Sequence, residues 1–234
     1  MHVGAHEAEE RWDYEKYGFG PVVWIEAQEN LAIQLSREVA SPSVVVHALV
    51  WNLDGELMTL NITNNGQSSS VFDLGTHKDS YPEIHVSATN TVLSSRLDTI
   101  LGADFSYNFL NLDIQGAEFE ALEGLGEQLS KFDFVYTEVN RSEVYLGIHP
   151  VADLDTFLEN AGFRRVASAW THQGWGDALY LRIDWIGDSL ESRAVIWLKI
   201  LTYGIYLSFK RLTPANYPRM LRSFLKKLNQ NKAQ

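Results

Sequence analysis

Residues 109–120 read FLNLDIQGAEFE, and this stretch decides the fold class. Phe109–Asp113 is a short, mostly apolar run that ends in an acid, which is typical of a buried strand. We expect a helix to follow over Ala117–Leu129. A buried strand that leads directly into a helix is the repeating unit of α/β proteins. The stretch therefore predicts a parallel sheet whose carboxyl edge presents Asp113 and Gln115.

The same alternation of strand and helix extends in both directions along the chain. Further buried strands are predicted over Val22–Ala27, Val44–Val50 and Phe132–Val139, and helices over Glu7–Tyr17, Glu29–Arg37 and Leu154–Ala161. Asp54–Gly55 indicates a hairpin that joins Trp51–Leu53 to Leu57–Ile62. Only a short loop separates Arg164–Ala169 from Ala178–Ile183, so these two form an antiparallel pair at the sheet edge. The sequence predicts an α/β fold with a mostly parallel sheet.

Composition excludes several classes of protein. The 234 residues include no cysteine, so disulfide frameworks, cysteine zinc sites, iron–sulfur clusters and cysteine nucleophiles are ruled out. Residues 1–191 hold all 30 acidic residues and 10 of the 19 Lys and Arg. A body this acidic argues against binding to nucleic acid. No cationic start followed by an apolar run opens the chain, so we expect no signal peptide and a cytoplasmic location.

Gly4 and Glu26 indicate a cofactor site. A glycine in the first turn after a strand lets a cofactor approach the backbone, and an acid at the end of the second strand can accept both ribose hydroxyls. The glycine pattern that cradles a pyrophosphate is absent, and Glu7 and Glu9 would repel phosphate. These residues favour S-adenosylmethionine, which carries no phosphate and has two cationic groups, over a nicotinamide cofactor. The alternative is that Gly4 and Glu26 only shape the turns in which they lie.

Seven segments together resemble the FkbM family of S-adenosylmethionine-dependent methyltransferases. In chain order they are VGAHEAEE (3–10), VWIEA (23–27), SSSVFDLGTH (68–77), RLDT (96–99), NLDIQGAEFE (111–120), YTEVN (136–140) and WGDALY (175–180). The resemblance implies the class I methyltransferase fold over residues 1–183, a Rossmann-like, seven-stranded sheet whose last strand is antiparallel. It also implies methylation of a hydroxyl oxygen on a sugar, polysaccharide or similar natural product. The family's frequent second glycine is Ala8 here.

The resemblance also assigns site residues. The cofactor would lie against Gly4, Ala5, His6, Glu7, Glu26 and Ala27, with Asn52 near the adenine. Asp113 and Gln115 would sit beside the reacting methyl group, and Ser69 and Ser70 belong to a loop that can fold over the site. A hydroxyl attacks poorly until its proton leaves, so a general base is expected among His77, Asp113 and Glu138, with His149 a weaker candidate. No metal site is predicted.

Residues 184–234 differ from the rest and are predicted to form a basic, apolar helical extension. Ala194–Phe209 is nearly continuous in apolar residues, and basic residues follow it. Residues 190–228 are expected either to dock on anionic lipid as an interfacial helix or to pack on the body or in a homodimer. A second hypothesis for the whole chain is a cofactor-binding module that performs no catalysis and serves as a partner or scaffold protein.

Overall fold

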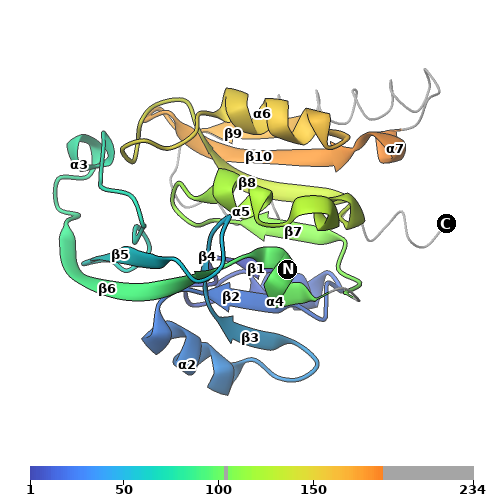
Figure 1. Cartoon of the computed structure of the whole chain (residues 1–234), viewed down its shortest axis with the longest axis horizontal. Helices are drawn as coiled ribbons and strands as arrows, with labels where there is room; N and C mark the ends of the chain where they lie inside the picture. The colour runs from blue at the N-terminus through green and yellow to red at the C-terminus, as the bar shows by residue number, and fades with distance from the viewer. Residues whose placement is uncertain (103–104, 187–234) are drawn as a thin grey trace.

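The computed structural model describes residues 1–102 and 105–186, and its main feature is a seven-stranded sheet (Figure 1). The strand order is β3-β2-β1-β7-β8-β10-β9. The bounds are β1 His2–Val3, β2 Val23–Glu26, β3 Val44–His47, β7 Phe109–Leu112, β8 Phe134–Asn140, β9 Phe163–Trp170 and β10 Trp175–Arg182. The strands from β3 to β8 are parallel neighbours, while β10 runs antiparallel to both β8 and β9. This confirms the predicted seven-stranded sheet and its antiparallel edge pair, with β9 outermost.

Helices cover both faces of this sheet because its central strands are apolar on both sides. Along β2, Val23 and Ile25 belong to one core cluster, and Trp24 between them belongs to the other. The first cluster also holds buried side chains of α4 (Leu97–Leu101), α5 (Glu118–Glu123) and α6 (Val151–Asn160), and the second holds those of α1 (Arg11–Lys16) and α2 (Glu29–Glu38). Successive side chains of a strand point to opposite faces of the sheet, so one strand can contribute to both core clusters.

A second, three-stranded sheet lies outside the main one, with the order β4-β6-β5. Its strands are β4 Leu49–Val50, β5 Leu57–Thr63 and β6 Val86–Ser95, and the β5–β6 ribbon projects from the body (Figure 1). The short helix α3 (His77–Ser80) lies in the connection between β5 and β6. The predicted single strand over Val44–Val50 is therefore wrong, because the chain leaves β3 after His47 and enters β4. β3 is also an edge strand. Its side chains are exposed or half-buried, whereas the sequence predicted a buried strand.

The predicted hairpin around Asp54–Gly55 is wrong as well. β5 pairs with β6, more than twenty residues further on, and residues 51–53 form no strand. The Asp54 carboxylate instead accepts hydrogen bonds from the Arg96 backbone N–H (2.6 Å) and from the Thr99 hydroxyl (2.7 Å). These bonds tie the turn to the start of α4, so it cannot close a two-residue hairpin. Arg96 in turn holds Asp98 in a side-chain ion pair, so Asp98 has a structural role at the start of α4.

The helix predicted over Ala117–Leu129 is two elements, α5 and the 3₁₀ helix η1 (Gly126–Lys131). Gly124 ends α5 where the backbone passes close to the Trp51 carbonyl oxygen, and Gly126 has a positive φ of 52°. Of the predicted extension, only residues 184–186 are described, within α7 (Ile183–Ile186), so its proposed contacts over 190–228 lie outside the described residues. None of the helices in the described ranges is long and apolar enough to cross a bilayer.

Candidate functional site

A cleft opens where β1, β2 and β7 end, at the carboxyl edge of the sheet. It encloses about 600 Å³ of space, the open solvent at its mouth included. Ligands of open α/β sheets bind at this edge. Eight residues predicted for the cofactor or for catalysis line it: Gly4, His6, Glu26, Ala27, Ser69, Ser70, Asp113 and Gln115. Among the described residues that line the cleft there is no lysine or arginine, so it offers phosphate no permanent cation.

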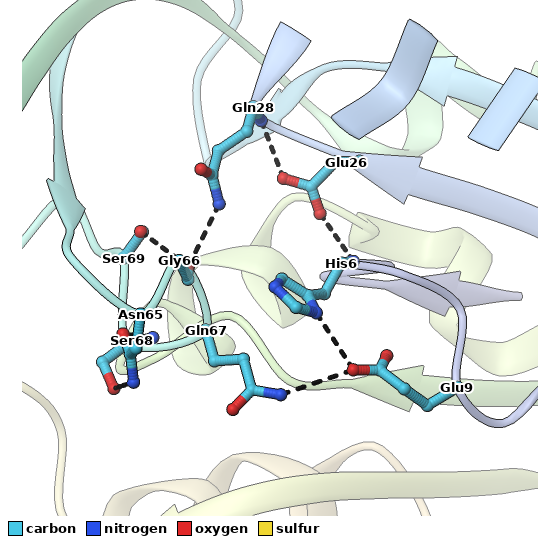
Figure 2. A network of polar contacts seen from close by, with 9 residues as sticks. All are labelled: His6, Glu9, Glu26, Gln28, Asn65, Gly66, Gln67, Ser68 and Ser69. Carbon is cyan, nitrogen blue, oxygen red and sulfur yellow. Dashed lines mark hydrogen bonds and ion pairs between the residues drawn. The ribbon is translucent and has the colours of Figure 1, made fainter. Parts of the chain in front are cut away.

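Glu26 ends β2 and is almost fully buried, with 5% of its surface exposed. One carboxylate oxygen accepts the His6 backbone N–H at 2.8 Å, and the other accepts the Gln28 backbone N–H at 2.7 Å (Figure 2). Burial raises the pKa of this carboxyl, and the backbone N–H groups oppose the rise. Each oxygen keeps a further lone pair, so the carboxylate can still accept two hydroxyl groups.

The first turn of the chain has an unusual backbone. Gly4 has a φ of 83°, and a Cβ at this position would clash with the Asp113 carbonyl oxygen, so the glycine is required by the close approach of β7. Ala8 has a φ of 52°, in the left-handed region that glycine adopts more readily. The left-handed geometry therefore exists here without the second glycine. The predicted neighbours Ala5 and Glu7 belong to this turn but do not line the cleft.

The segment 64–70, here called the cleft loop, lies along the cleft near His6 and Gln28 (Figure 2). The Gln28 side chain donates to the Gly66 carbonyl oxygen at 3.1 Å, and the Gln67 side chain donates to Glu9 at 3.3 Å. Glu9 also contacts the His6 ring at 3.0 Å, a contact that raises the pKa of His6 and lowers that of Glu9 to about 2. The cleft loop is thus hydrogen-bonded to the turn that follows β1 and to the residues that follow β2.

Beyond β7, Gln115 joins the residues predicted beside the reacting methyl group. Its side-chain nitrogen donates to Asp113 at 2.7 Å and to Glu138 at 3.1 Å, and its side-chain oxygen accepts the Tyr145 hydroxyl at 2.6 Å. Asp113 is exposed toward the cleft, although desolvation by the surrounding protein raises its pKa. Glu138 is buried behind Gln115, and burial raises its pKa well above the ordinary value.

Glu118 extends this acidic region at the start of α5. It is 3% exposed, and its carboxylate accepts the backbone N–H of Ile114 (2.9 Å) and of Gly116 (3.0 Å). Burial, and to a smaller extent the charge of Asp113, raises the pKa of Glu118 to about 8. The side chain thus shapes the loop that carries Gln115, and its carboxyl tends to hold a proton near neutral pH.

This raised pKa predicts how stability changes with pH. Between pH 4.5 and 8 the folded protein binds more protons at Glu118 than the unfolded chain does, so stability falls as pH rises. We expect the free energy of unfolding to fall by about 2–4 kcal/mol between these limits from this group. Glu118→Gln keeps an oxygen that can accept both N–H groups and should remove the part of the fall that comes from Glu118, while the part from Glu138 remains. Urea denaturation at pH 5.5 and 8 measures it, with the exposed Glu127→Gln as the control that leaves the fall unchanged.

Two predicted residues lie away from the cleft. His77 is buried in α3, and its ring lies tilted against the rings of Tyr81 and Tyr145. Its Nδ1 has no hydrogen-bond partner among the described residues, and burial lowers its pKa. Asn52 donates to Glu123 at 2.8 Å and is not among the lining residues. His149, the weaker candidate, stacks on Phe119.

Sequence reasoning assigned no role to Gln28, Gln67, Glu118 or Tyr145. Gln28 has a local signal, because it follows the acid of β2 by two positions. Glu118 could be noticed as an acid in the first turn of a helix. Gln67 and Tyr145 carry no such signal, since their contacts depend on how two long connections fold back onto the sheet.

The fold and the cleft together define a class: an open, doubly wound α/β protein with a cleft at the carboxyl edge of its sheet, in which a buried acid ends the second strand and the described lining residues include no fixed cation. The family model described as "Methyltransferase FkbM domain" matches residues 2–165. The chain belongs to the FkbM methyltransferase family, and its cofactor is S-adenosylmethionine. Glu26, with its free lone pairs, and the cleft without fixed cations fit that cofactor.

Among solved structures, the chain resembles magnesium protoporphyrin IX methyltransferase from Synechocystis PCC 6803 with bound SAM. The two are 11% identical, the TM-score is 0.43, and the match covers 77% of this chain and 68% of that one. A search of curated proteins finds no match.

Proposed function

We propose that this methyltransferase acts on a hydroxyl oxygen of a sugar, polysaccharide or similar natural-product acceptor. The observation that carries the proposal is Asp113, a carboxylate that is exposed in the cleft and fixed by Gln115 at 2.7 Å. An alcohol needs a base to remove its proton as it attacks, whereas a neutral amine does not. A fixed, accessible carboxylate beside the cofactor cleft therefore favours oxygen as the acceptor atom.

The residues of the cleft would have separate roles in binding the cofactor and in transferring the methyl group. Bound S-adenosylmethionine supplies a methyl group on a sulfonium that an oxygen nucleophile can displace. Glu26 would bind the ribose hydroxyls of the cofactor, and Asp113 would accept the proton that leaves the acceptor hydroxyl. Glu138 holds a proton more strongly because it is buried, so it is better suited to support Gln115 than to act as the base. The cleft loop would help to exclude water from the reacting groups.

The test is a transfer assay with S-adenosylmethionine labelled in its methyl group. The purified full chain is incubated with a panel of monosaccharides and oligosaccharides, and separately with amines of similar size. The proposal predicts label in a methyl ether that survives mild alkali. Label found only in amines would overturn the assignment to oxygen. Cofactor binding without transfer to any acceptor would favour a cofactor-binding module instead.

A further inference from the structure

Tyr145 is a buried hydroxyl donor next to the proposed site. Its side chain is fully buried with Val144 and Ile148, in the connection between β8 and α6. The hydroxyl lies 2.6 Å from the Gln115 side-chain oxygen and 3.3 Å from the Ser68 carbonyl oxygen. Burial raises the pKa of the phenol, so it stays protonated and can donate a hydrogen bond at all ordinary pH values.

The Gln115 amide has two chemically different ends, and its neighbours decide which way it faces. Because Tyr145 donates to the oxygen, the nitrogen points toward Asp113 (2.7 Å) and Glu138 (3.1 Å). The two N–H bonds of one amide nitrogen then serve two carboxylates. The opposite orientation would place the amide oxygen against both of them.

The backbone of Gln115 is also held in place. It has a positive φ of 56°, which is uncommon for a residue with a side chain, and its carbonyl oxygen accepts the Ser70 hydroxyl at 2.7 Å. Ser68 and Ser70 both belong to the cleft loop. The side chain of Gln115 is therefore fixed by Tyr145, and its backbone by Ser70 of the cleft loop.

We infer that Tyr145 is a positioning residue: its hydroxyl orients the Gln115 amide so that Asp113 is held by an N–H donor and faces the cleft. The inference deepens the proposed function, because it concerns the carboxylate that would accept the acceptor's proton. Tyr145 itself touches neither of the carboxylates that it helps to orient. Its hydroxyl bonds to the Gln115 side chain and to the Ser68 carbonyl oxygen, so it reaches Asp113 through Gln115.

The consequence is measurable in the protein without any ligand. An N–H donor stabilises the charged carboxylate and so lowers its pKa. In Tyr145→Phe the Gln115 amide oxygen loses the donor that fixes it, the N–H bond to Asp113 is held less firmly, and the pKa of Asp113 should rise by about half a unit or more. Titration of the Asp113 carboxyl carbon by NMR in ¹³C-labelled protein reports this shift. The other charged groups that act on Asp113 stay the same in the variant: His2, Glu9, Glu10, Glu118 and Glu138.

The matched control is Tyr180→Phe. Tyr180 is also fully buried, and its hydroxyl donates to Asp155 at 2.8 Å, away from the cleft. This variant loses a buried hydroxyl of the same kind, so it should lose similar stability with no change at Asp113. Gln115→Met removes the donor itself and should reproduce the shift of Tyr145→Phe.

An unshifted Asp113 in folded Tyr145→Phe, with a shift in Gln115→Met, would overturn the inference, because Gln115 would then keep its orientation without Tyr145. An unshifted Asp113 in both would overturn it too. If Tyr145→Phe does not fold, Tyr145→Met repeats the test with another apolar side chain. The titration uses no cofactor or acceptor. A negative transfer assay would therefore count against the proposed function, and an unshifted Asp113 would count against the role of Tyr145.

Discussion

Replacing Asp113 by Asn is expected to lower the rate of methyl transfer by about 10²–10⁴-fold, the usual contribution of a general base. The substitution keeps an oxygen that can accept the Gln115 N–H, so the local hydrogen bonding survives. The variant should remain folded and should still bind S-adenosylmethionine. Steady-state transfer to whichever hydroxyl acceptor the assay identifies measures the loss.

The pH dependence of the same reaction follows from the pKa of Asp113. The base works only when it is deprotonated, so activity is lost as pH falls through its pKa. Because desolvation raises that pKa above the ordinary 3.8, the acid limb of the rate profile should lie above about pH 4. Asp133→Asn is the matched control, since Asp133 lies just before β8, at the opposite end of the strand from Glu138. Equal rates for Asp113→Asn and the parent would show that another group removes the proton.

Gly4→Ala is expected to destabilise the protein by roughly 3 kcal/mol or more. A left-handed φ costs an L-residue about 1–2 kcal/mol, and the new methyl group would also collide with the Asp113 carbonyl oxygen. The strain falls on the turn that hydrogen-bonds to Glu26, so the affinity for S-adenosylmethionine should fall as well. Urea denaturation and calorimetry measure the two effects.

Gly162→Ala separates the cost of the left-handed φ from the cost of the collision with the Asp113 carbonyl oxygen. Gly162 has nearly the same φ, 85° against 83° for Gly4, but a Cβ there would meet nothing within 4 Å. Its loss of stability should therefore be only the conformational part, about 1–2 kcal/mol. If the two variants lose the same stability, the close approach between Gly4 and β7 has no energetic importance, and the packing explanation for this glycine is wrong.

The sequence predicts those strands whose residues are buried in the core, because burial leaves a local apolar pattern in the sequence. β2, β7 and β8 are buried on both faces, so they appear as apolar runs that end in Glu26, Asp113 and a segment containing Glu138. Most of β6 is exposed, with polar residues such as Ser87 and Thr89, so no hydrophobic pattern reveals it. The hairpin signal at Asp54 failed because contacts with Arg96 and Thr99, more than forty residues away, decide the turn.

The site residues, too, fall into those that the sequence predicts and those that it does not. Residues at strand ends, such as Glu26 and Asp113, can be placed together because parallel strands end at one edge of the sheet. His77 follows the serines of the cleft loop in the sequence, but the chain buries it in α3 beside Tyr145 and not at the cleft. Long connections fold according to contacts across the molecule, which a local pattern does not encode.

The central claim is that this cleft binds S-adenosylmethionine through Glu26, and calorimetric titration of the cofactor and of S-adenosylhomocysteine tests it most directly. The parent should bind both. Glu26→Ala should bind both about 100-fold more weakly, because the two ribose hydroxyls lose charge-assisted hydrogen bonds. Glu29→Ala, a neighbouring exposed acid, should bind like the parent. Equal binding by Glu26→Ala, or no binding by a folded parent, would contradict the account.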